Sequence, residues 1–234
     1  MALGAPARAV DFSVPTGNFG DIFAGYVARK MGLPVRKLRI ASNVNDILPR
    51  TLKSGIYEVR EVHATASPSM DIQVSSNFER LLFEAGGRDA DTVRRLMASL
   101  TQSGRFVLPD AMLATIRAEF DAGRADETET AAAIRAAWRE AGELVDPHTA
   151  VALAVADRDI PDSKVPNIVL STAHAAKFPD AVEAACGVRP QLPPWLDGLM
   201  TKTEQVKTMR NDQAEVERFV RSVSRAVKQQ GVAG

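Results

Sequence analysis

The stretch F-S-V-P-T-G-N-F-G-D-I-F-A-G-Y-V-A-R-K, residues Phe12–Lys30, decides the fold. Apolar residues alternate over residues 10–14, which predicts a short strand that Pro15 ends. Two glycines follow in the turn at residues 17–20, and residues 21–31 then have the pattern of a helix. A strand that leads through a glycine turn directly into a helix is typical of an α/β layer.

The same alternation of strands and helices recurs along the chain. Residues 35–41 predict the next strand, and residues 45–55 predict the next helix after a short connection. A helix over residues 131–144, a second that begins at Asp146-Pro147 and a buried strand over residues 167–171 continue the pattern. We therefore expect an α/β fold with an open, mainly parallel sheet that is flanked by helices.

Two regions between these elements are less regular. Ser76 and Glu79 have the spacing of a capping box, which predicts that a helix begins at Ser76. Residues 86–130 predict two or three helices and an exposed loop at residues 123–126. The sequence contains no repeat and no low-complexity linker, so we expect one domain over residues 1–234.

The composition argues against several classes of protein. Lysine plus arginine and aspartate plus glutamate number 29 each, so the chain lacks the basic excess of a nucleic-acid-binding surface. Cys186 is the only cysteine, which excludes a disulfide within the chain and fits a reducing compartment. The absence of a long apolar run predicts a cytoplasmic protein without a membrane partner. The three histidines and Cys186 have no zinc-site spacing, so we predict no metal.

The glycine turn at residues 17–20 has the features of an anion-binding site. The first turn of a helix leaves backbone N–H groups unpaired, and the helix dipole adds partial positive charge there. Glycine lets the backbone approach a ligand closely, so the pattern favours a bound phosphate. The spacing is neither that of a Walker A loop nor that of the dinucleotide fingerprint. The alternative is a purely structural turn in which the charge of Asp21 stabilises the helix.

Thr172 follows the predicted strand at residues 167–171 directly. Ligands of open α/β sheets bind beyond the carboxyl ends of the strands, where both the glycine turn and Thr172 are expected. The hydroxyl could contact a ring nitrogen of a ligand, or it could satisfy the backbone of its own turn.

Four stretches of the sequence resemble threonine synthase, and they occur in the order of that family: V-P-T-G-N-F-G-D-I-F-A-G-Y-V-A-R-K-M-G-L-P, S-P-S-M-D-I-Q-V-S-S-N-F-E-R-L-L-F, D-P-H-T-A-V and S-T-A-H-A-A-K-F-P. The resemblance covers nearly the whole chain. It implies a pyridoxal 5′-phosphate (PLP) enzyme with the tryptophan synthase β-like fold, PLP fold type II. Such enzymes convert O-phospho-L-homoserine and water to L-threonine and phosphate.

The resemblance implies cofactor-binding roles for six residues: Gly17, Asn18, Phe19, Gly20, Asp21 and Thr172. The first five match the loop that binds the cofactor's 5′-phosphate, largely through backbone N–H groups. Thr172 matches the hydroxyl residue that contacts the pyridine nitrogen, which a neutral hydroxyl would leave without a full proton. Ala175 stands where the family usually has proline, a change that loosens the loop and keeps the hydroxyl.

The family's Schiff-base lysine lies in its N-terminal region, together with much of the small domain. This chain starts after that region, and its lysines do not match that position; they are residues 30, 37, 53, 164, 177, 202, 207 and 228. The resemblance therefore implies the C-terminal, cofactor-binding portion of a threonine synthase, with the N-terminal half absent and no catalytic residue in this chain. Alone, it should show little or no turnover, and it is either a gene fragment or the partner of a complementary half.

Other functions remain open from the sequence. A noncatalytic α/β protein could retain the phosphate site and bind a phosphorylated metabolite or a partner chain. A related PLP lyase, such as threonine dehydratase or cysteine synthase, is a further alternative, although the stretch S-P-S-M-D-I-Q-V-S-S-N-F-E-R fits threonine synthase better. A sheet without its other half exposes an edge and an apolar face, so the isolated chain should self-associate or be marginally stable.

Overall fold

The computed structural model describes residue 4, residues 7–158 and residues 164–226. The chain divides into two compact units, residues 1–191 and residues 192–234. The second unit contains the short 3-10 helices η3 (Pro194–Leu196) and η4 (Leu199–Thr201) and the helix α9 (Gln213–Val223). The expectation of one domain over residues 1–234 stays a prediction.

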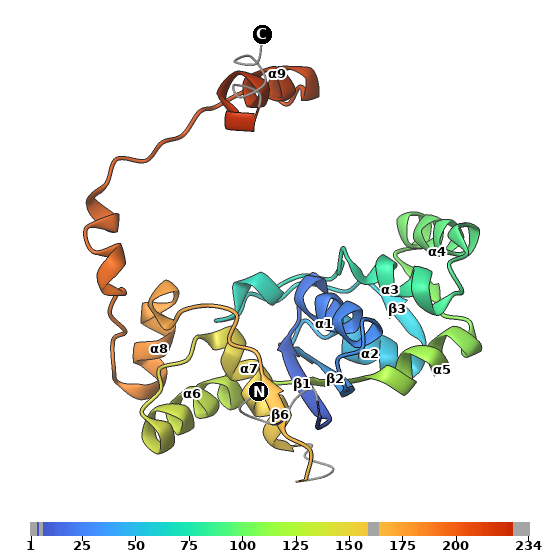
Figure 1. Cartoon of the computed structure of the whole chain (residues 1–234), viewed down its shortest axis with the longest axis horizontal. Coiled ribbons are helices and arrows are strands. Elements are labelled where there is room, and N and C mark those ends of the chain that lie inside the picture. The colour runs from blue at the N-terminus through green and yellow to red at the C-terminus, as the bar shows by residue number, and fades with distance from the viewer. Residues whose placement is uncertain (1–3, 5–6, 159–163, 227–234) are drawn as a thin grey trace. The chain divides into compact units, whose positions relative to one another are not determined.

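A four-stranded sheet organises the first unit (Figure 1). Its strands lie in the order β5-β2-β1-β6, and every neighbouring pair is parallel. The strands are β1 (Val10–Pro15), β2 (Val35–Ser42), β5 (Phe120–Arg124) and β6 (Asn167–Val169). A separate antiparallel pair joins β3 (Ile56–Glu58) to β4 (Arg105–Val107). The parallel sheet that the sequence predicts is thus confirmed.

Eight α-helices are described in the first unit, and they connect or cover the strands: α1 (Gly20–Lys30), α2 (Ile47–Ser54), α3 (Phe78–Ala85), α4 (Ala90–Ser103), α5 (Asp110–Glu119), α6 (Glu127–Ala141), α7 (Pro147–Arg158) and α8 (Pro179–Cys186). Two 3-10 helices lie between them, η1 (Pro68–Met70) and η2 (Ala175–Lys177). The helices expected over residues 21–31, 45–55 and 131–144 are all present, with ends shifted by a few residues.

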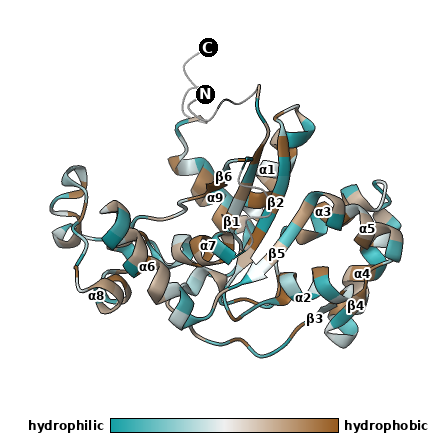
Figure 2. Cartoon of the chain, turned by 90° about the horizontal axis from the view of Figure 1, so that it is seen from below, coloured by the Kyte–Doolittle hydropathy of each residue, from teal (hydrophilic) through white to brown (hydrophobic). Residues whose placement is uncertain are grey.

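The sheet has a core on each face because the side chains of a strand alternate in direction. Leu38 and Ile40 of β2 pack with Ile22 of α1 in the larger cluster. Ala41 points the other way and packs with Val151 of α7. Figure 2 colours much of β1 and β6 as apolar, in keeping with strands that lie between two layers of helices.

The expectation of an exposed loop at residues 123–126 is wrong. Residues 120–124 form β5, which pairs in parallel with β2 from Phe120 to Arg124. The segment F-D-A-G-R lacks the alternating apolar pattern of a strand because β5 is an edge strand with one neighbour. Gly123 is required there by packing, since a Cβ atom at this position would lie 2.7 Å from Cγ1 of Val155.

Two smaller expectations also differ from the structure. Helix α3 begins at Phe78, and its N-cap is Asn77 without a side-chain capping bond, so the capping box at Ser76 is wrong. The strand expected to be buried over residues 167–171 is the shorter β6, whose residues are only half-buried. Among the described strands, β6 pairs with β1 alone, which leaves its other edge without a partner.

No helix in the described ranges of the chain is long and apolar enough to cross a membrane.

Candidate functional site: the glycine turn and its surroundings

The backbone of the glycine turn is held in an unusual conformation at Phe19. This residue is the N-cap of α1 and has φ 71° and ψ 4°, the left-handed region that residues with a side chain rarely occupy. Its side chain is only 1% exposed, and its ring centroid lies 5.3 Å from that of Phe78 and 5.8 Å from that of Phe120. Burial of this aromatic ring compensates for the backbone strain and fixes the turn.

The carbonyl groups of the turn are bonded on one side, to the segment that precedes α3. The Ser75 hydroxyl donates to the Gly17 carbonyl oxygen at 2.7 Å. The backbone and side-chain nitrogens of Asn77 both donate to the Asn18 carbonyl oxygen, at 3.0 and 2.9 Å. These bonds turn the acceptors of residues 17–18 away from the opposite side of the turn.

The backbone N–H groups of the turn have few partners. The Gly20 N–H donates to Oδ1 of Asn18 at 2.9 Å. Within the described part of the chain, the N–H groups of Gly17, Asn18 and Phe19 donate to no acceptor. Unpaired amides at the start of a helix attract an anion, because the helix dipole adds to their partial positive charge. The turn can therefore bind a phosphate group without a basic side chain.

Gly17 is a position where only glycine fits. A Cβ atom on Gly17 would lie 2.6 Å from the backbone oxygen of Ser69, closer than real Cβ contacts come. The 3-10 helix η1, which contains Ser69, thus forms the wall behind the glycine turn. The close approach explains the first glycine of the sequence motif in physical terms.

Thr172 lies beyond the end of β6, next to the strand that leads into the glycine turn. Strands β1 and β6 are parallel neighbours, and Ser13 pairs with Val169, so both chains leave the sheet at the same edge. Thr172 is exposed, and its hydroxyl bonds to no described residue. The alternative, in which this hydroxyl forms a hydrogen bond with the backbone of its own turn, is thus not observed among the described residues. Asp21 lies exposed in the first turn of α1.

Asp146 and His148 form a buried polar pair close to the wall of the turn. Asp146 is 0% exposed and His148 is 5% exposed. Nδ1 of His148 lies 2.8 Å from Oδ1 of Asp146, and the Thr149 hydroxyl donates to the other carboxylate oxygen. Burial raises the pKa of Asp146, but the hydrogen bonds from His148 and Thr149 outweigh it and hold the pKa below its ordinary value.

Sequence reasoning did not assign roles to all of these residues. The sequence assigns no role to Ser75 and Asn77, because their bonds to the turn carbonyls depend on long-range packing. The signal that could have found them is the need of two turn carbonyls for donors. His174 caps η2, where its Nδ1 accepts the Ala176 N–H at 3.1 Å. In the described residues, no group of three or more His, Cys, Asp or Glu side chains could hold a metal ion.

The parallel sheet, with turn amides at its carboxyl edge that bond to no described acceptor, defines the chain as an α/β protein with a candidate anion-binding turn. Comparison with known proteins identifies the family that this chain resembles. The family described as "Threonine synthase, C-terminal" matches residues 149–220. The chain is 46% identical over 221 residues to the threonine synthase of Pseudomonas aeruginosa and 41% identical over 217 residues to that of Corynebacterium glutamicum. These matches cover 94% and 90% of this chain, but 47% and 45% of the two relatives.

Solved structures give the same result. The PLP-bound threonine synthase of Brucella melitensis matches 96% of this chain with a TM-score of 0.86 and 59% identity. The yeast threonine synthase matches 94% with a TM-score of 0.81 and 36% identity. Each match covers 48% of the solved chain. The resemblance to the C-terminal portion of threonine synthase, and with it PLP fold type II, is confirmed, and the chain spans about half the length of the relatives it matches.

Proposed function

We propose that this chain is the cofactor-binding half of a threonine synthase, a PLP-dependent lyase that makes L-threonine and phosphate from O-phospho-L-homoserine and water. The observation that carries the proposal is the row of N–H groups at Gly17, Asn18 and Phe19 that bond to no described acceptor, in a chain that resembles threonine synthase over nearly its whole length. A cytoplasmic location is part of the same proposal.

The residues of the turn fit the phosphate group of PLP. The glycine turn at residues 17–20, called the phosphate cradle below, needs glycine at residue 17 because the backbone of Ser69 lies so close. Its N–H groups without a described acceptor suit a dianion. Thr172, at the same edge of the sheet, offers a neutral hydroxyl to the ring nitrogen. Asp21 is exposed in the first turn of α1, where its charge is compatible with a bound phosphate only if the side chain faces away.

These residues indicate what the cofactor and this chain would each contribute to the reaction. PLP, when bound, supplies an electron sink for carbanion chemistry at the substrate. The turn amides hold its phosphate, and Thr172 orients its ring. The lysine that links the cofactor covalently belongs to the other half in this proposal. Two of the described lysines are engaged elsewhere, since Lys30 pairs with Glu119 at 2.8 Å and Lys37 with Asp121 at 3.5 Å.

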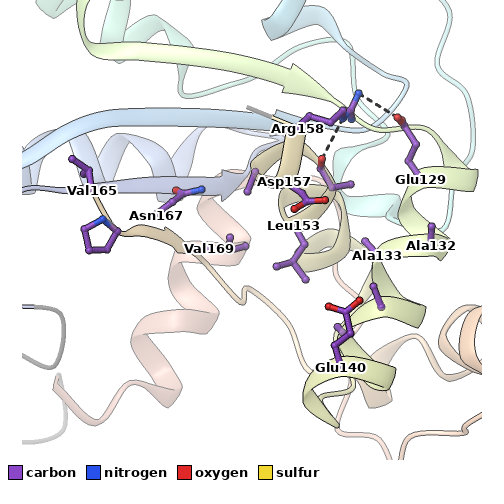
Figure 3. Close-up of a pocket in the computed structure, with 15 residues that line it drawn as sticks. Glu129, Ala132, Ala133, Glu140, Leu153, Asp157, Arg158, Val165, Asn167 and Val169 are labelled. Carbon is purple, nitrogen blue, oxygen red and sulfur yellow. Dashed lines mark hydrogen bonds and ion pairs between the residues drawn. The ribbon is translucent and has the colours of Figure 1, made fainter. Parts of the chain in front are cut away.

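The edge of β6 that pairs with no described strand is the proposed docking surface for that other half. Next to this edge lies a pocket of about 790 Å³ between α6, α7 and β6 (Figure 3). Figure 3 shows Val165, Asn167 and Val169 on one side and Ala132 and Ala133 of α6 on the other. At the rim, Nη1 of Arg158 pairs with Oε1 of Glu129 at 3.2 Å. A mostly apolar pocket beside a free strand edge suits a polypeptide that adds a strand and buries apolar side chains.

The proposed occupant is the counterpart of the N-terminal region of the relatives. These relatives are about twice as long as the matched segment, and they carry the additional chain that this surface would bury. Small alanine side chains on α6 allow close packing of a strand or helix. The two halves would then form one continuous α/β layer.

A titration of the purified chain with PLP, followed by absorbance, tests the proposal. We expect saturable binding through the phosphate, release of the cofactor on dialysis and no borohydride-stable adduct on a single lysine by mass spectrometry. Pyridoxal, which lacks the phosphate, should bind at least about tenfold more weakly because the turn amides lose their anion.

Two other outcomes would change the conclusion. No binding of PLP would overturn the proposed cofactor role. A stable adduct on one defined lysine would mean that this chain carries its own covalent anchor, so the assignment of that lysine to another half would be wrong.

A further inference from the structure

The imidazole of His148 bridges two segments of the candidate site. Its Nδ1 faces the carboxylate of Asp146 at 2.8 Å, and its Nε2 lies 3.2 Å from the backbone nitrogen of Ser69. A backbone N–H can only donate, so Nε2 is the acceptor and the proton of the neutral ring is on Nδ1. Asp146 thereby fixes the tautomer that can hold the Ser69 peptide.

The Ser69 peptide is the part of η1 that limits the glycine turn. Its carbonyl oxygen is the atom that a Cβ on Gly17 would meet at 2.6 Å. This oxygen and the N–H group that donates to Nε2 of His148 both belong to Ser69. The bond to His148 thus holds the residue against which the turn packs. A shift of η1 by a few tenths of an ångström would move the wall of the phosphate cradle.

The residues that flank η1 are held by a second set of bonds. Nδ2 of Asn43, which follows β2, donates to the Ser67 hydroxyl at 3.0 Å and to Oδ1 of Asp71 at 2.8 Å. Asn43 and Ser67 are both 0% exposed. Asn43 thus bonds to the residues that flank η1 at both ends, and His148 bonds to its central residue, Ser69, whose carbonyl oxygen faces Gly17.

The segment with His148 also touches the chain that follows Thr172. Val145 forms an isolated antiparallel bridge with His174. The ring of His148 lies 4.8 Å from that of Phe178, measured between centroids. One buried segment therefore contacts both the wall of the glycine turn and the loop that carries the predicted ring-nitrogen contact.

We propose that His148 is a positioning residue that sets the shape of the phosphate cradle through the Ser69 peptide. This inference rests on the proposed cofactor role of the turn, and it assigns to His148 a task that needs no contact with the ligand. Asp146 serves this task by holding the imidazole in the required tautomer. The cradle is then sensitive to an acceptor at the position of Nε2, rather than to the aromatic ring itself.

The test compares His148→Asn with His148→Gln. Asparagine can replace Nδ1 and keep a bond to Asp146, whereas glutamine can place an acceptor near the position of Nε2. We expect His148→Asn to weaken PLP binding by about tenfold, and His148→Gln to stay within about threefold of the unaltered chain, because loss of one acceptor leaves a backbone donor unpaired. Binding of pyridoxal should change by less than about twofold in both variants, because it lacks the phosphate.

His63→Asn is the matched control, since the side chain of His63 is exposed and lies outside these contacts. A thermal transition measured for each variant separates misfolding from a local effect. Equal PLP affinity of His148→Asn and the unaltered chain would overturn the positioning role. So would parallel losses for PLP and pyridoxal, or a glutamine variant as weak as the asparagine variant. If the unaltered chain does not bind PLP, both the cofactor role and the positioning role are wrong. If only the variants behave differently from the expectation, the positioning role alone is wrong.

Discussion

Gly17→Ala is expected to weaken PLP binding by about 5-fold to about 150-fold, the range that an overpacking strain of ~1–3 kcal/mol gives. The added methyl group would lie 2.6 Å from the Ser69 oxygen and 3.4 Å from Cα of Met70. Both are backbone atoms, so neither can move aside by a change of rotamer. The turn must instead move away from η1, which redirects the unpaired N–H groups of residues 17–19. The dissociation constant, from absorbance titration, is the measurement that checks this result.

Gly25→Ala provides the matched control for this substitution. Gly25 lies in the same helix α1, and its added methyl group would meet only the tip of Leu38, Cδ2, at 3.0 Å. A leucine side chain can adjust, and alanine favours the helix, so PLP affinity should stay within about twofold. If Gly17→Ala binds PLP as tightly as the unaltered chain does, the turn does not form the phosphate site. A similar loss in both variants would indicate a general effect on the helix.

The strands and helices that the sequence predicted share strong local signals. Residues 10–14 alternate in polarity, and Asp146-Pro147 combines an N-cap with proline at the first helical position, so β1 and α7 could be located from their own residues. Strand β5 could not. Its residues F-D-A-G-R form a strand only because β2 is beside them, and that pairing joins segments about 80 residues apart in sequence. Edge strands of this kind follow from tertiary contacts rather than from local pattern.

In the candidate site, too, some residues could be located from local sequence and others depend on tertiary contacts. The glycines and Thr172 could be selected from the sequence, because a glycine turn before a helix and a hydroxyl after a strand have recognisable chemistry. The left-handed conformation of Phe19 and the contact of His148 with Ser69 could not be selected. Both depend on residues that are distant in sequence, and an isolated histidine in a first helical turn is more often a packing residue. The identity of the ligand came from resemblance, since spacing alone indicated only an anion.

Addition of the N-terminal half of the Brucella melitensis threonine synthase is expected to convert this chain from inactive to active. That enzyme is 59% identical to this chain in the matched region, so its other half should find a compatible surface. The chain alone should form no L-threonine from O-phospho-L-homoserine above background. The reconstituted pair should exceed that background by at least about 10³-fold, because covalent catalysis becomes possible only when the linking lysine is present. Phosphate release and threonine formation, measured together, check the result.

Ala132→Arg tests whether the two halves meet at the pocket beside β6. Ala132 lines that pocket and is exposed in this chain, so an arginine there should leave the fold intact. Docking would require burial of its charge in a mostly apolar pocket, so the affinity between the halves should fall at least about tenfold. Ala98→Arg on the exposed face of α4 is the control and should assemble normally. Equal assembly of the two variants would place the interface elsewhere. A chain that binds PLP but never gains activity from the added half would retain its phosphate site and lose its assignment as half of an enzyme.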